Sequence, residues 1–142
     1  MDQFAEFVGN HALLSLAFIG LLLALIYNEI HQKTRGFKEL TSAGVTSLIN
    51  GSEAVVIDVS SNNDFNAGHI VNAVHVPLSQ VDPESKLLSK FKDRPTVVYC
   101  KNGQASPQAC AKLAKGGFSD LYMLKGGMLT WLADQLPVTK RK

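Results

Sequence analysis

An apolar run of 16 residues near the N-terminus, from Ala12 to Tyr27, contains no charged side chain and is interrupted only by Ser15 and Gly20. As a helix this run spans roughly 24 Å, slightly less than the hydrocarbon core of a bilayer at about 30 Å. Apolar residues upstream extend it to a span of about residues 7–27. Because no polar residue recurs at helical spacing, the run predicts a transmembrane helix, with the lipid bilayer as a partner, rather than a buried core helix.

The charges on either side of this run predict its orientation. No lysine or arginine precedes it, whereas Lys33, Arg35 and Lys38 follow it closely. The positive-inside rule therefore predicts a single-pass protein of the inner (plasma) membrane, with its N-terminus outside and the remaining chain in the cytoplasm. Asp2 and Glu6 are unlike the basic start of a cleaved signal peptide, so we expect the anchor to stay uncleaved.

The chain has 142 residues and a formal net charge of +2, which argues against a polybasic protein that binds nucleic acid. Its length beyond the anchor suits one domain. We expect four parts: a membrane anchor over residues 1–28, a polar linker over 29–36, a folded domain over 37–138 and a basic tail over 139–142.

Two uninterrupted apolar runs, Ala54–Ile57 and Val97–Tyr99, are typical of strands buried on both faces. Further strands are expected at about Val74–Val76 and at Leu121–Leu124. Helices are expected in five segments: from Thr41 or Ser42 to Gly51, a single turn over Asn63–Asn66, Pro83–Phe91, Ser106–Lys115 and Met128–Ala133. This alternation predicts an α/β fold in which a parallel sheet is flanked by helices and ligands bind beyond the carboxyl ends of the strands.

Cys100 lies where the second apolar run ends, and the residues after it read as a short loop and a helix start. That loop comprises Lys101, Asn102, Gly103, Gln104, Ala105 and Ser106. Gly103 permits a tight turn, Ser106 is expected to cap the helix, and Pro107 suits its first position. Because unpaired amides at a helix start favour an anion, we expect Cys100 to ionise easily and act as a nucleophile rather than as an inert buried thiol.

The second cysteine, Cys110, falls on an apolar stripe of the same helix and is interpreted as core, with a role as a resolving thiol left open. A disulfide is not expected in the reducing cytoplasm. The histidines are scattered and have no cysteine or carboxylate at ligand spacing, so no metal site is expected.

Several short signatures occur in order and carry a resemblance to a known family. They are Val55–Val59, Asp64-Phe65, Gly68-His69-Ile70, Ala73, Val76-Pro77, Cys100, Gly103, Ser106, Gly117-Phe118, Leu124, Gly126-Gly127, Trp131 and Leu136–Val138. Over residues 37–138 the sequence resembles the rhodanese-type sulfurtransferases, and its layout is similar to that of small bacterial membrane-anchored members.

The resemblance implies that the Cys100 thiolate takes a sulfur atom from a sulfane-sulfur donor, holds it as a persulfide and passes it to a thiol acceptor. It implies no metal or organic cofactor. The loop from Lys101 to Ser106 would bind the anion, and Asp58 and His69 would support the structure.

Two positions depart from the family pattern, because Ser60 and Ala105 stand where arginine is common. Without those cations we expect thiosulfate to be a poor donor. The related phosphatase chemistry is not expected, because Ser106 occupies the position where it needs arginine. Two other functions stay open: an interaction module for a membrane-protein partner, and a thiol redox sensor.

Overall fold

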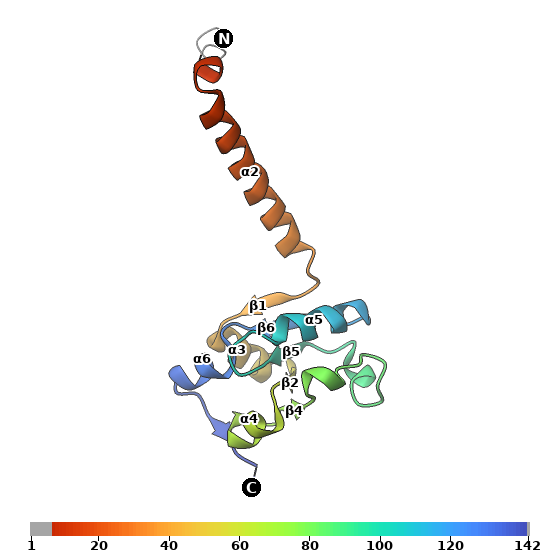
Figure 1. Cartoon of the computed structure of the whole chain (residues 1–142). Helices are drawn as coiled ribbons and strands as arrows, with labels where there is room; N and C mark the ends of the chain where they lie inside the picture. The colour runs from red at the N-terminus through yellow and green to blue at the C-terminus, as the bar shows by residue number, and fades with distance from the viewer. Residues whose placement is uncertain (1–6, 142) are drawn as a thin grey trace. The chain divides into compact units, whose positions relative to one another are not determined.

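The N-terminal apolar run forms one long helix, α2, over Ala12–Lys33 in the computed structural model, which describes residues 7–141 (Figure 1). Its segment Ala12–His31 has a mean hydropathy of 2.1, and no part of this segment is buried in the described structure. The 22 residues of α2 extend roughly 33 Å, enough to cross a hydrocarbon core of about 30 Å. The helix continues past the expected span, which ended at residue 27. Residue 28 and the first part of the expected linker, residues 29–33, are therefore helical.

From Gly36 onward the chain forms a separate compact unit. Its main sheet has five strands in the order β1-β6-β5-β2-β4, and every neighbouring pair is parallel, as the sequence predicts. The strands are β1 (Lys38–Leu40), β2 (Val55–Asp58), β4 (Val74–His75), β5 (Thr96–Tyr99) and β6 (Leu121–Leu124). A small antiparallel pair joins β3 (His69–Ile70) to β7 (Val138–Thr139).

Helices pack on both faces of this sheet. They are α3 (Ser42–Ser52), α4 (Asn62–Ala67), α5 (Ser106–Lys115) and α6 (Gly127–Ala133), with short 3-10 helices at Leu78–Gln80 and Ser89–Phe91. Along β2, Val55 and Ile57 join the cluster that α5 covers, whereas Val56 joins the cluster under α3 and α6. Because both faces are covered, β2 and β5 are apolar at every position from Val55 to Ile57 and from Val97 to Tyr99, which explains the unbroken runs in the sequence.

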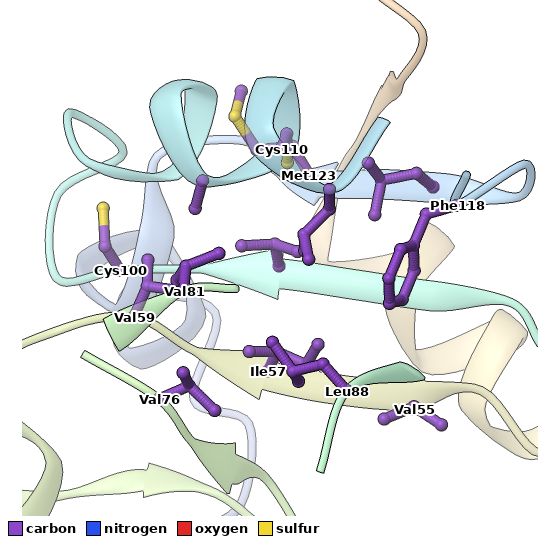
Figure 2. Close-up of a cluster of buried hydrophobic side chains, with 14 residues drawn as sticks. Val55, Ile57, Val59, Val76, Val81, Leu88, Cys100, Cys110, Phe118 and Met123 are labelled. Atoms are coloured by element: carbon purple, nitrogen blue, oxygen red, sulfur yellow. The ribbon is translucent and has the colours of Figure 1, made fainter. Parts of the chain in front are cut away.

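The cluster beneath α5 reaches the end of β5, where Cys100 lies (Figure 2). Ile57, Val98, Leu88 and Leu113 are fully buried within it. This packing fixes the carboxyl end of β5 and the first turn of α5, and so it positions the loop between them.

The prediction of a helix over Pro83–Phe91 is wrong, because the segment forms turns and only the 3-10 helix Ser89–Phe91. Local side-chain hydrogen bonds compete with the helix here. Asp82 Oδ1 accepts from the Glu84 amide at 2.9 Å, and Ser85 Oγ accepts from the Leu88 amide at 3.3 Å.

The helix at residues 42–52 begins as expected, because Thr41 is its N-cap and accepts from the Gly44 amide. It does not stop at Gly51, however. It continues to Ser52, and Glu53 ends it in the left-handed conformation with φ of 49°. The sequence predicted the end of this helix at Gly51 because the left-handed conformation is usually taken by glycine.

Candidate active site

Cys100 lies directly after β5, the central strand of the sheet, at its carboxyl end. Its side chain is almost fully buried, at 3% exposure. Sγ accepts a hydrogen bond from the Gly103 amide at 3.1 Å. Gly103 adopts φ of 84°, a conformation that suits glycine, and so the loop can turn its amide back onto the sulfur. In Figure 2 the sulfur points away from the buried cluster, toward the loop that leads into α5.

The surroundings of Cys100 lower the pKa of its thiol. Burial alone raises it, but the nearby Ser106 hydroxyl and the backbone amides of Ser106, Ala105 and Asn102 outweigh burial. All of these donors stabilise the negative form of the sulfur. The thiolate is the nucleophilic form of cysteine, so this site favours reactivity.

Ser106 is not the N-cap that the sequence predicts. Ala105 holds that position with a helical backbone and no side-chain hydrogen bond, and Ser106 is the first residue of α5. The Ser106 hydroxyl is fully buried and has no hydrogen-bond partner of ordinary geometry among the described residues. It acts instead on the nearby thiol, whose pKa it lowers.

Replacing Ser106 with alanine is expected to shift the pH profile of Cys100 alkylation upward. In the wild type the alkylation rate rises with pH as the thiolate forms, with a midpoint below the ordinary value of a cysteine thiol. Losing the Ser106 hydroxyl, a donor worth about 1 kcal/mol to the thiolate, lowers the rate below the midpoint by about fivefold. Peptide mapping after iodoacetamide pulses measures the rate, and Gln104→Ala, an exposed change in the same loop, is the control. An unchanged midpoint in Ser106→Ala would contradict this role.

The other predicted loop residues contribute mainly backbone to the site. Lys101, Asn102 and Gln104 have exposed side chains. Lys101 Nζ lies 3.1 Å from Asp64 Oδ1, and Asn102 Oδ1 accepts from the Gln104 amide at 3.1 Å. The Ser61 hydroxyl and Lys101 lower the pKa of Asp64. The Lys101 charge is therefore paired with α4.

Helix α6 holds the loop from its other side, which the sequence did not predict. The Met128 amide donates to the Cys100 carbonyl at 2.8 Å, and the Leu129 amide donates to the Lys101 carbonyl at 3.0 Å. Gly127 packs so closely that an added Cβ would lie 2.3 Å from the Cys100 carbonyl oxygen. The glycine pair at 126–127 was the signal in the sequence, since it marks a close backbone approach.

Asp58 lies at the end of β2 and is buried, at 1% exposure. Its Oδ1 accepts from the Ser60 amide at 2.8 Å and from the Ser60 hydroxyl at 2.5 Å. Burial, and then the nearby Asp58 carboxylate, raise the pKa of Tyr99. These contacts make Asp58 suited to fixing the chain after β2, and they show that Ser60 serves as its partner.

His69 ties α4 to β3. Its Nδ1 donates to the Phe65 carbonyl at 2.8 Å, and its ring stacks on Phe65 at 3.8 Å. His75 stacks on Phe65 at 4.3 Å. Such contacts suit the structural support expected of His69.

Cys110 is fully buried in α5, and burial together with the nearby Cys100 raises the pKa of its thiol to about 12. A protonated, inaccessible thiol is a poor nucleophile. Of the two cysteines, Cys100 is therefore the one suited to chemistry.

A cleft of about 320 Å³ lies beside the loop, and Lys101 forms part of its lining. Residues from β2, α4, α6 and β7 complete the lining: Asp58, Ser60, Asp64, Ala67, Gly68, Met128, Leu129, Leu132, Val138 and Lys140. Ligand pockets commonly occupy this edge of a parallel sheet.

Comparisons with known proteins agree with this geometry. A family model described as the rhodanese-like domain matches residues 41–134. The uncharacterized protein YibN of Escherichia coli (strain K12) is 33% identical, with all of both chains covered. The thiosulfate sulfurtransferase GlpE of Coxiella burnetii is 29% identical over 68% of this chain and 89% of its own. The rhodanese-like domain of an Anabaena protein, solved by NMR, aligns with a TM-score of 0.64 and 27% identity, over 72% of this chain and 79% of that one.

Proposed function

The chain belongs to the rhodanese-like family, and we propose that it is a membrane-anchored sulfurtransferase that carries sulfane sulfur as a persulfide on Cys100. The observation that carries this proposal is the Cys100 thiol, held beneath a loop whose amides and Ser106 hydroxyl lower its pKa. The same donors lie around Sγ of Cys100, and in this proposal they also stabilise the charge of a terminal persulfide sulfur.

The proposed cycle has two displacements. The Cys100 thiolate attacks the outer sulfur of the donor, a new S–S bond forms, and the donor's own S–S bond breaks with its electron pair on the donor sulfur. An acceptor thiolate then attacks the outer sulfur of the Cys100 persulfide. The S–S bond to Cys100 breaks, and its electron pair restores the Cys100 thiolate. No external oxidant or reductant is needed.

The proposed location is the inner membrane, with the N-terminus outside and the rhodanese-like domain in the cytoplasm. Helix α2 has the length and apolar composition to cross a bilayer. Lys33, Arg35 and Lys38 follow its apolar segment, which supports this orientation by the positive-inside rule. A reducing cytoplasm also keeps Cys100 as a free thiol between turnovers.

Intact-mass measurement of the full chain in detergent micelles tests the proposed chemistry. The protein is mixed in turn with thiosulfate, inorganic polysulfide and a cysteine persulfide, and each sample is then mapped by peptide. We expect one added sulfur atom on Cys100 with the persulfide, and less with thiosulfate, because Ser60 and Ala105 supply no cation for a sulfonate group. Protein alkylated beforehand is the control. No added sulfur from any donor would contradict the proposal.

A second candidate function is protein binding without sulfur transfer, at a membrane-protein partner. It is favoured by the same two positions, since Ser60 and Ala105 leave the site without the arginines common in the family. Such a module does not need the thiol, whereas a sulfur carrier does.

A further inference from the structure

We infer that the cleft beside the Cys100 loop receives a polypeptide segment that carries the cysteine with which Cys100 exchanges sulfur. This inference rests on the proposed function, and it specifies the class of sulfur partner. Three features of the cleft support it: the exposed leucines on its wall, the balance of its charges and its connection to the loop.

Two exposed leucines of α6 form the apolar wall. Leu129 and Leu132 are 54% and 49% exposed and line the cleft together with the largely buried Met128, whereas Trp131 belongs to the core. Within the described residues from Gly36 onward, the other large apolar side chains this exposed are Val71 and Leu87. Adjacent exposed leucines beside a reactive loop are typical of a surface that binds another molecule.

The charges around the cleft do not favour a small anionic donor. Two carboxylates, Asp58 and Asp64, formally cancel two ammonium groups, Lys101 and Lys140. Lys101 is already paired with Asp64 at 3.1 Å. A sulfonate or an anionic lipid headgroup therefore meets no net positive charge. A chain with apolar side chains and a balanced charge is complementary to this surface.

The cleft is small and adjoins the loop. At about 320 Å³ it lies at the small end of ligand pockets, which span about 300–1,000 Å³. It therefore holds a few side chains, while the rest of the partner stays outside. The Leu129 amide donates to the Lys101 carbonyl at 3.0 Å, so the leucine wall is bonded directly to the loop beside Cys100. Cys100 does not itself line the cleft, but the next residue, Lys101, does, so a segment bound there lies beside the Cys100 loop.

The exchange balances without a further reactant. The Cys100 thiolate attacks the outer sulfur of the partner's cysteine persulfide, and the S–S bond within the partner breaks. The electron pair leaves on the partner's cysteine as a thiolate, and Cys100 becomes the persulfide. The reverse reaction delivers sulfur to a partner thiol.

Peptide donors test this inference on the full chain in detergent micelles. One ten-residue peptide carries a cysteine persulfide flanked by leucines, and a second carries serines in place of the leucines. We expect wild-type Cys100 to be loaded about tenfold faster from the leucine peptide, as burial of apolar side chains in the cleft implies. The double variant Leu129→Ser with Leu132→Ser should lose this preference. Leu87→Ser, an exposed leucine outside the cleft, should keep it.

The outcomes separate this inference from the proposed function. Loading of Cys100 without a preference for the leucine peptide, or a preference that survives in the double variant, overturns the inference alone. Absence of loading from every donor overturns the proposed function as well. The assay is repeated in nanodiscs of neutral and of anionic lipid. If anionic lipid abolishes the preference in the wild type, lipid occupies the cleft and the inference is overturned.

Discussion

Replacing Cys100 with serine is expected to abolish sulfur loading completely. A serine hydroxyl stays protonated at neutral pH and cannot form a persulfide. The hydrogen-bond donors of the loop remain in this variant, but the nucleophile is lost. Intact-mass measurement with each donor should find no added sulfur, against one added atom in the wild type. Cys110→Ala is the matched control and should keep loading at Cys100, because Cys110 is buried with a raised pKa. Sulfur found on the Cys100→Ser protein would refute the assigned nucleophile.

The same variant distinguishes a sulfur carrier from an interaction module. If the chain only binds a partner, Cys100→Ser should recover that partner from membranes as well as the wild type does and should support the same growth. If the chain carries sulfur, the variant should lose the cellular phenotype even where binding persists. A redox sensor predicts a third result, which is a sulfenic acid or a Cys100–Cys110 disulfide after peroxide.

The central strands could be predicted from sequence because they obey a simple physical rule. Strands covered on both faces need apolar side chains at every position, and the runs at residues 54–57 and 97–99 meet that need. The parallel sheet and the flanking helices follow from the alternation of these runs with helical segments, and both are confirmed.

Other elements could not be predicted, since they depend on partners distant in the sequence. The strand β1, Lys38–Leu40, has no apolar run and exists because it pairs with Tyr122–Leu124. The pair β3–β7 joins residues 70 positions apart, His69 with Thr139. The expected helix at residues 83–91 failed for a local reason, because Asp82 and Ser85 side chains bond to nearby amides.

Part of the candidate site could likewise be predicted from the sequence, and part could not. Placing Cys100 at the end of a central strand required only the pattern of a strand, a loop and a helix. The role of Ser106 could not be predicted from the sequence. Ala105 takes the N-cap position of α5, so Ser106 is instead the first residue of the helix and its hydroxyl is buried. The cleft was also not predicted, since its lining comes from five separate segments of the chain.

Replacing Gly127 with alanine is expected to destabilise the domain and to displace the Cys100 loop. Gly127 adopts φ of 65°, and an added Cβ would lie 2.3 Å from the Cys100 carbonyl oxygen and 2.8 Å from the Gly103 amide nitrogen. These are backbone atoms, which cannot rotate away as a side chain can. Backbone strain and overpacking together imply a loss of about 2–5 kcal/mol in the free energy of unfolding. Denaturation followed by the fluorescence of Trp131, the single tryptophan, measures this loss.

The effect on chemistry should appear in the folded protein as well. Moving the Gly103 amide weakens its 3.1 Å hydrogen bond to Sγ, so the pKa of Cys100 should rise toward its ordinary value and the alkylation profile should move to higher pH. Gly51→Ala is the matched control, because a Cβ there meets no atom within 4 Å and alanine favours a helix. We expect it to keep wild-type stability or exceed it. A Gly127→Ala protein with normal stability and an unshifted profile would mean that the start of α6 does not hold the loop, and that the amides around Cys100 are positioned by β5 and α5 alone.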